Sequence, residues 1–153
     1  MPAGKLRLKN LYPNVAAIFK AGTSRALSRP IIQTRVAAGF PSPAEDYLEK
    51  RLDLNKHLVR HPLSTFYIRV IGDSMRDENI HDGDLLVVDR AEEAVHGDII
   101  IACVEGEFCC KRLQINNGGA KLCSANPKYP DIELTPETDW EVWGKVLFSI
   151  RPH

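Results

Sequence analysis

The pattern of hydrophobic and polar positions changes in character near residue 64. From there onward, short runs rich in β-branched and aromatic residues alternate with Gly, Asn, Asp and Pro turn signals, which is typical of β-strands. The expected strands are Thr65–Ile71, Leu85–Asp89, Asp98–Val104, Glu107–Leu113, Ala120–Ser124, Asp131–Leu134 and Trp140–Ile150. Because Glu105-Gly106 separates two alternating runs, a tight hairpin is expected there. Residues 65–153 are therefore predicted to form a small, curved, antiparallel β domain, and the fold class is mostly β.

The segment before this domain, residues 39–64, is predicted to be a linker with one short helix. Gly39-Phe40-Pro41-Ser42-Pro43 cannot join a helix, since its two prolines impose an extended conformation. The next residues carry apolar side chains at helical spacing, which predicts a helix from Ala44 to Leu52. Asp53-Leu54-Asn55 is expected to end this helix. Residues 38 and 39 then lie on extended, exposed backbone that a protease can bind.

Charge divides the chain into two parts, although the 153 residues have a net charge of zero. Residues 1–38 hold seven basic side chains and no acidic one. Removing seven from the total of 20 basic residues leaves 13 basic against 20 acidic in residues 39–153, a net charge of −7. The sequence thus predicts an extended basic N-terminal arm, residues 1–38, attached to an acidic body on which it can lie.

Other interpretations of the arm are an organellar transit peptide, a secretory signal and a nucleic-acid-binding segment. The apolar run Val15–Phe19 is too short for a secretory segment, and no run approaches the length of a membrane span. The basic residues could neutralise several phosphates, so nucleic-acid binding stays a rival interpretation. The four cysteines lack a C-x-x-C pair, which favours a reducing compartment and argues against a zinc site. No cofactor or metal is predicted.

Two short motifs carry the candidate chemistry. Gly72-Asp73-Ser74-Met75 ends the first predicted strand, where a serine hydroxyl just after a glycine stands clear of the sheet. In the run that ends at Leu113, Lys111 shares a face with Cys109, and if that face is apolar the lysine points inward. Burial lowers the pKa of a lysine, and a neutral amine can take the proton of a serine hydroxyl. The alternative is a lysine whose amine reaches solvent at a strand end.

The motifs resemble those of the LexA/UmuD family of self-cleaving Ser–Lys peptidases. The matching stretches are Gly72-Asp73-Ser74-Met75, His81-Asp82-Gly83-Asp84-Leu85-Leu86-Val87-Val88-Asp89, His96-Gly97-Asp98, Glu107-Phe108 and Lys111-Arg112-Leu113. The stretch from Ala38 to Tyr47 resembles the cleavage-site region of the UmuD branch. In this resemblance Ser74 is the nucleophile, Lys111 is the general base, and the chain cuts itself between Ala38 and Gly39, which removes the arm.

The resemblance also implies a setting for the activity. It implies a cytoplasmic homodimer of the SOS response whose cleavage is stimulated by RecA on single-stranded DNA. The trimmed dimer would join a UmuC-like polymerase subunit in error-prone translesion synthesis, with the sliding clamp as a further candidate partner. Neither membrane association nor sequence-specific DNA binding is expected.

Several rival functions remain open at this point. A LexA-like regulator of transcription has the same peptidase but needs a DNA-reading helical domain, which 38 residues interrupted by Pro13 and Pro30 are not expected to form. A signal-peptidase-like enzyme would need a membrane anchor. A Ser–His–Asp hydrolase would use Ser74 with His96 and Asp98, although His96 beside a glycine is more typical of a turn residue. A non-catalytic β-rich adaptor would tolerate the loss of Ser74.

Overall fold

The computed structural model describes residues 5–6, 15, 17–22, 26–32, 39 and 49–153. Its strands are β1 (Lys5–Leu6), β2 (Ala17–Lys20), β3 (Ser28–Ile32), β4 (Glu49–Asp53), β5 (Thr65–Arg69), β6 (Leu85–Asp89), β7 (Ile99–Val104), β8 (Glu107–Asn116), β9 (Gly119–Cys123), β10 (Ile132–Leu134) and β11 (Trp140–Ile150). One short α-helix, α1 (Leu54–Leu58), and one 3₁₀ turn, η1 (Arg76–Glu78), complete the described elements. The predicted strands beyond residue 64 are all confirmed, with small shifts at their ends.

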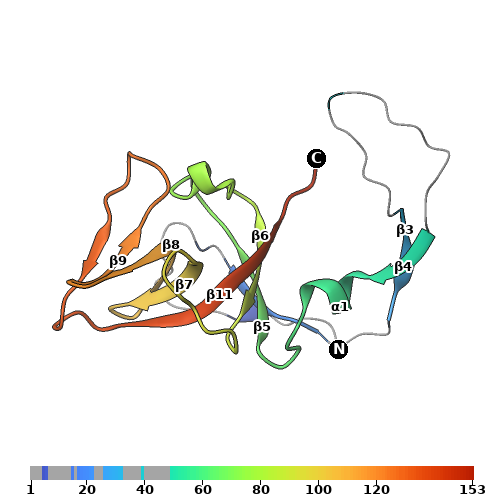
Figure 1. Cartoon of the computed structure of the whole chain (residues 1–153), viewed down its shortest axis with the longest axis horizontal. Helices are drawn as coiled ribbons and strands as arrows, with labels where there is room; N and C mark the ends of the chain where they lie inside the picture. The colour runs from blue at the N-terminus through green and yellow to red at the C-terminus, as the bar shows by residue number, and fades with distance from the viewer. Residues whose placement is uncertain (1–4, 7–14, 16, 23–25, 33–38, 40–48) are drawn as a thin grey trace.

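One antiparallel sheet of nine strands forms the body, in the order β1-β2-β5-β6-β11-β7-β8-β9-β10. The long strand β11 crosses the middle of the molecule and pairs with both β6 and β7 (Figure 1). Its register shifts between Val142 and Gly144 and again between Val146 and Phe148. Such bulges bend a strand and increase its twist, which explains the curvature of the sheet. The prediction of a mostly β, curved antiparallel fold with one short helix is confirmed.

The core consists of two hydrophobic clusters that share strands β7 and β8. One contains Cys110 and Ile101, and the other contains Cys109 and Ile100, because successive side chains of a strand point to opposite faces. Strand β8 is therefore buried on both faces near its middle. A side chain placed there is withdrawn from water whichever way it points, and this determines the environment of Lys111.

The predicted position of the helix is wrong. Residues 49–53 form β4, which pairs with β3, and the helix begins afterwards at Leu54. Asp53 starts this helix instead of ending one, since its carboxylate accepts a hydrogen bond from the Asn55 backbone N–H at 3.0 Å. An aspartate in this role is an N-cap. The remainder of the predicted helix, residues 44–48, lies outside the described residues.

Residues before the proposed cleavage site take part in both sheets. Strands β1 and β2 extend the large sheet beyond β5, whereas β3 forms a separate two-stranded sheet with β4. Figure 1 shows this two-stranded sheet on the side of the molecule opposite β8 and β9. No helix among the described residues is both long enough and apolar enough to cross a membrane.

Candidate active site

Ser74 lies in a tight turn that follows β5. Gly72 adopts a positive φ of 83°, which favours glycine, and its N–H donates to the Asp82 carboxylate at 2.7 Å. The chain then turns so that the Arg76 N–H donates to the Asp73 carbonyl at 3.2 Å, immediately before η1. Ser74 itself is 5% exposed, and its neighbour Met75 packs in the core. These hydrogen bonds and buried side chains hold the turn that carries Ser74 in one position, as a nucleophile needs.

Lys111 lies in the middle of β8 and is 7% exposed. Its neighbours on the same strand face, Cys109 and Leu113, are also buried, as the alternation of side chains predicted. The inward orientation expected from the sequence is thus confirmed. None of the ion pairs formed by the described residues includes Lys111.

The segment that follows β9 links Lys111 to the Ser74 turn. The Lys111 Nζ donates to the Ser124 hydroxyl at 2.8 Å, and the next residue, Ala125, donates its N–H to the Ser74 carbonyl at 2.8 Å. Ala125 also accepts a hydrogen bond at 2.8 Å from the Asp77 N–H. The two predicted site residues, which are far apart in the sequence, are therefore held against the same short stretch of chain.

Two further side chains from this stretch secure Asp73, the residue before Ser74. Asn126 donates its side-chain amide to the Asp73 carbonyl at 2.9 Å, and the Tyr129 hydroxyl donates to the Asp73 carboxylate at 2.7 Å. The Tyr129 ring also lies 6.0 Å from the Lys111 Nζ. The hydrogen bond from Tyr129 lowers the pKa of Asp73, which therefore stays ionised. Asp73 thus shapes the turn that carries Ser74.

Burial is the main electrostatic feature at Lys111. It disfavours the ammonium form and lowers the pKa of Lys111. Burial likewise raises the pKa of the Cys109 thiol to about 11 and that of the Cys110 thiol to about 12, so both stay uncharged at neutral pH. The neutral thiols of these two preceding residues add no negative charge that would hold the proton on the lysine. The negative charge of Asp131 raises the pKa of Lys111, but by less than burial lowers it.

Comparison with known proteins gives the same assignment as the motifs. The model of a family described as Peptidase S24-like matches residues 30–147, which include both Ser74 and Lys111. The chain belongs to this family.

Individual relatives place it within the LexA/UmuD family, in the UmuD branch. The chain is 44% identical to Protein MucA of Salmonella typhimurium over 138 residues, which are 89% of this chain and 94% of MucA. It is 50% identical over 122 residues to Protein SamA of Salmonella typhimurium, covering 80% of this chain and 84% of SamA. The LexA repressor of Xylella fastidiosa is 35% identical over 97% of this chain and 69% of its own length. These relationships support a self-cleaving serine peptidase of the SOS-related group.

Only one of the two residues that flank the expected cleavage site belongs to the described part of the chain. Ala38 lies outside the described residues, and Gly39 is exposed. Among the described residues other than Gly39 itself, none places a heavy atom within 4 Å of the position that a Cβ would take on Gly39.

The rival Ser–His–Asp triad is not supported by the contacts of its members. The His96 Nδ1 accepts a hydrogen bond from the Ile115 N–H at 2.9 Å, which is a turn-stabilising role. Asp98 pairs with Lys145 at 3.0 Å and accepts a hydrogen bond from the Val95 N–H at 2.8 Å. Both side chains thus have structural partners of their own.

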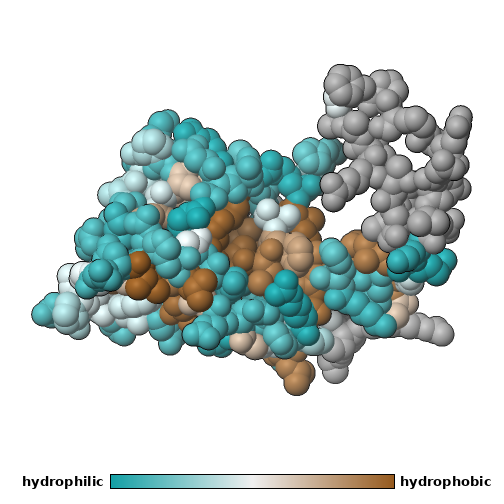
Figure 2. Space-filling model, in the orientation of Figure 1, coloured by the Kyte–Doolittle hydropathy of each residue, from teal (hydrophilic) through white to brown (hydrophobic). Residues whose placement is uncertain are grey.

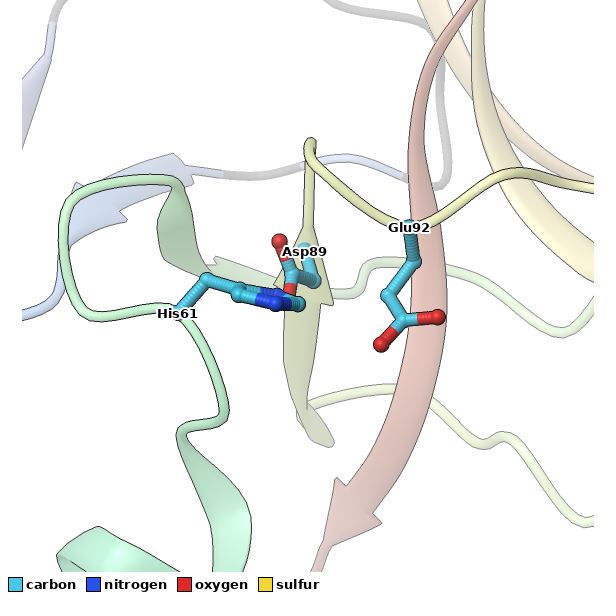
Figure 3. Close-up of side chains that lie close together, drawn as sticks. All are labelled: His61, Asp89 and Glu92. Carbon is cyan, nitrogen blue, oxygen red and sulfur yellow. The ribbon is translucent and has the colours of Figure 1, made fainter.

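One group of possible metal ligands among the described residues was not foreseen from the sequence. His61, Asp89 and Glu92 bring ligand atoms within 4.8 Å of one another (Figure 3). The His61 Nδ1 lies 2.6 Å from one Asp89 oxygen, and the other oxygen accepts from the Ser64 hydroxyl at 2.8 Å. Glu92 pairs with Arg60 at 3.2 Å. Each side chain thus has partners within the protein, and these contacts fasten the turn before β5 to the end of β6.

Ser124 is a site residue that the sequence reasoning missed. Strands β8 and β9 pair from Asn116↔Gly119 to Arg112↔Cys123, and one further step along this register brings Ser124 opposite Lys111. Asn117-Gly118 is typical of a two-residue hairpin turn, and a hairpin with this turn predicts the pairing of Ser124 with Lys111.

Replacing Ser124 with alanine is expected to slow self-cleavage about tenfold, because the Lys111 amine loses the hydroxyl that orients it. Ser124→Thr keeps a hydroxyl and is expected to restore most of the rate. The measurement is the first-order rate at which a fragment beginning at Gly39 appears. Equal rates for the alanine and threonine variants would show that the hydroxyl does not position the amine.

Proposed function

We propose that this chain is a self-cleaving peptidase in which Ser74 and Lys111 form the catalytic pair and the bond between Ala38 and Gly39 is the substrate. The observation that carries the proposal is the buried Lys111 amine, hydrogen-bonded to Ser124 on the segment that also holds the Ser74 turn. Family membership supports the same chemistry. A lysine in such a place is costly to the fold and is best explained by a need for its neutral form.

The reaction proceeds in two steps, formation of an ester on Ser74 and hydrolysis of that ester. In the first, the Ser74 oxygen attacks the Ala38 carbonyl carbon while Lys111 accepts the hydroxyl proton, and Lys111 then gives this proton to the departing Gly39 nitrogen. The result is an ester between Ser74 and residues 1–38. In the second step, Lys111 takes a proton from water, which attacks the ester. Ser74 regains its proton from Lys111, and Ala38 leaves the serine as a carboxylic acid that gives its remaining proton to the solvent and becomes a carboxylate. Backbone N–H groups at the Ser74 turn stabilise the oxyanion.

The exposed position of Gly39 supports a regulated reaction. A tethered bond needs little affinity for the catalytic site, because a well-oriented intramolecular group can have an effective molarity of about 10⁵ M or more. The rate is then set by the fraction of molecules in which the segment around Gly39 has docked at Ser74. A partner that favours the docked form increases the rate by shifting this population. RecA assembled on single-stranded DNA is the proposed partner.

The trimmed protein acts in the cytoplasm as a homodimer that joins a UmuC-like polymerase subunit, with the sliding clamp as a further partner. Membership in the UmuD branch supports this setting. Figure 2 shows hydrophobic surface gathered in the middle of one face, where strands β6 and β11 run in Figure 1. Large apolar side chains such as Leu54, Leu63 and Ile150 are exposed in the structure. Apolar surface of this kind supports association with a second copy.

A LexA-like regulator of transcription is the second candidate, because the chain is 35% identical to a LexA repressor over 97% of its length. The two candidates differ in DNA binding. A regulator binds one operator sequence far more tightly than unrelated DNA, whereas a polymerase subunit does not. Titration of the purified protein with specific and random duplexes separates them.

The test of the peptidase is incubation of the purified protein at increasing pH. A fragment that begins at Gly39 is expected to accumulate faster as Lys111 loses its proton, and Ser74→Ala is expected to abolish it. Ser149→Ala is the matched control, because Ser149 is an exposed serine of β11. Mass spectrometry identifies the cut bond. A fragment with another N-terminus, or an undiminished yield from Ser74→Ala, would refute the proposal.

A further inference from the structure

Two strands that precede the proposed cut pair with strands that follow it. Strand β2 pairs antiparallel with β5 from Ala17↔Arg69 to Lys20↔Phe66, and the Ala21 N–H then donates to the Thr65 carbonyl at 3.0 Å. Strand β3 pairs antiparallel with β4 from Ser28↔Asp53 to Ile32↔Glu49. The bond between residues 38 and 39 therefore lies, in sequence, between the two strands of the β3–β4 pair.

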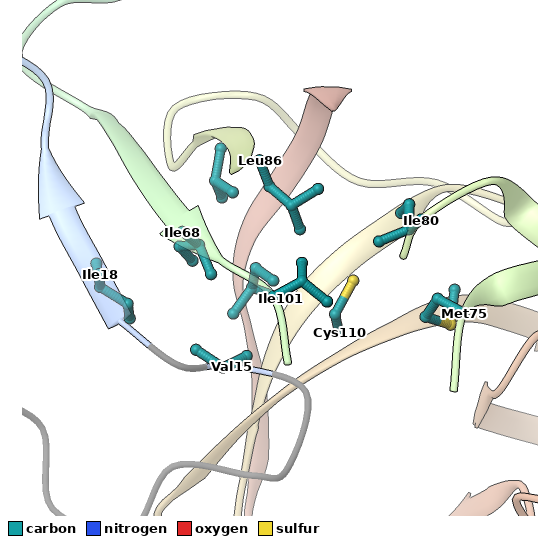
Figure 4. Close-up of a cluster of buried hydrophobic side chains, with 10 residues drawn as sticks. Val15, Ile18, Ile68, Met75, Ile80, Leu86, Ile101 and Cys110 are labelled. Carbon is teal, nitrogen blue, oxygen red and sulfur yellow. The ribbon is translucent and has the colours of Figure 1, made fainter. Parts of the chain in front are cut away.

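The β2 segment is also part of the hydrophobic core. Val15 is 1% exposed and Ile18 is fully buried, although both belong to the arm. They pack in the same cluster as Ile68 of β5 and as Met75, the residue after Ser74 (Figure 4). The arm is therefore not a cationic tail laid on a finished body, because its apolar residues complete the core beneath the proposed catalytic turn.

The β3–β4 pair adds a second attachment. Arg51 of β4 donates a side-chain hydrogen bond to the Ser28 carbonyl at 2.9 Å, in addition to the pairing of the two backbones. Hydrolysis of one bond in the connection between these strands breaks none of these contacts. It replaces a closed loop by two free ends, which become a carboxylate at Ala38 and an ammonium at Gly39.

From these contacts we infer that residues 1–38 stay bound to residues 39–153 after the cut, as a noncovalent complex held by the free edges of β5 and β4. The inference rests on the proposed function for the cut itself. It changes the expected outcome of cleavage, since the seven arm cations remain on the body and the net charge stays at zero. Release of the arm then requires a competitor for the edge of β5, a strand of another molecule that adds to the sheet.

The experiment is to cut the wild-type protein at alkaline pH, return it to neutral pH and analyse it by gel filtration and native mass spectrometry at about 1 μM, where complexes with nanomolar affinity stay intact. The two pieces are expected to co-elute, with the mass of the uncut chain plus one water, and to separate in urea. Elution of residues 39–153 without residues 1–38 would overturn the inference.

Failure of the cut is a different outcome, because it counts against the proposed function and not against retention. Retention is then tested on the Ser74→Ala chain carrying the recognition sequence of an added protease between Ala38 and Gly39. Co-elution after that protease acts supports the inference, and separation overturns it.

Two arm variants, each losing a large aliphatic side chain, test the contacts named above. Ile18→Ala removes a fully buried side chain, and Leu27→Ala removes one that is 59% exposed. Ile18→Ala is expected to weaken binding of the cut arm by at least about thirtyfold, and Leu27→Ala by less than about threefold. Equal affinities for the two variants would show that β2 does not hold the arm. If Ile18→Ala does not fold before cleavage, co-elution of the wild-type pieces still decides the question.

Discussion

A Lys111→Arg protein is expected to cleave itself far more slowly than the wild type at any pH at which it stays folded. Arginine keeps the positive charge of this position but cannot become a base, because its guanidinium stays protonated in proteins. The expected loss is about 10²–10⁴-fold, the usual contribution of a positioned general base. In the wild type, burial lowers the pKa of Lys111, so the reactive neutral form becomes populated at a lower pH than for an exposed lysine.

The pH profile distinguishes this explanation from a simple loss of packing. Below the lowered pKa of Lys111, the wild-type rate is expected to rise about tenfold for each pH unit, and above it to level off. The Lys111→Arg rate is expected to stay flat. The matched control is Lys121→Arg, since Lys121 is paired with Asp131 at 3.3 Å and its pKa is raised by that hydrogen bond. A Lys111→Arg rate that follows the wild-type profile would remove Lys111 from the mechanism.

The strands beyond residue 64 could be predicted because their determinants are local. Alternation and turn residues define each run, and Glu105-Gly106 illustrates this. Both residues adopt positive φ values, 50° and 79°, as a tight hairpin between β7 and β8 requires. The inward side of Lys111 followed from the same alternation. Ser74 and Lys111 could thus be named as candidates from the sequence, since Ser74 follows a strand end and Lys111 stands on a strand face.

The elements that could not be predicted depend on distant partners. Strand β4 was mistaken for part of a helix because its partner, β3, lies many residues earlier and its own sequence does not alternate. Strand β2 was considered only as an apolar run too short for secretion, whereas its burial comes from pairing with β5. Ser124 was missed because turn signals were used to separate strands and not to fix their register. The assignments of β2, β4 and Ser124 thus all depend on which strands pair and in which register.

Arg151→Gln is expected to lower the melting temperature by about 5–10 °C, because it leaves the Asp84 carboxylate buried without its counter-ion. Asp84 is fully buried, and its two oxygens accept hydrogen bonds from the Arg151 side chain at 2.7 and 2.8 Å. The control is Arg60→Gln, which breaks the solvent-exposed pair between Arg60 and Glu92. Exposed pairs contribute little, so a change below about 2 °C is expected there.

The dependence on pH tests the cause of this loss. The Arg151 hydrogen bonds lower the pKa of Asp84, and a lowered carboxyl pKa stabilises the fold above the unfolded-state pKa. That contribution disappears as pH falls through the lowered pKa of Asp84. The difference in stability between wild type and Arg151→Gln should therefore be largest near neutral pH and shrink in acid, where Asp84 is protonated in both proteins. Chemical unfolding across this range gives the comparison, and a constant difference would mean that Arg151 stabilises the C-terminal segment by packing alone.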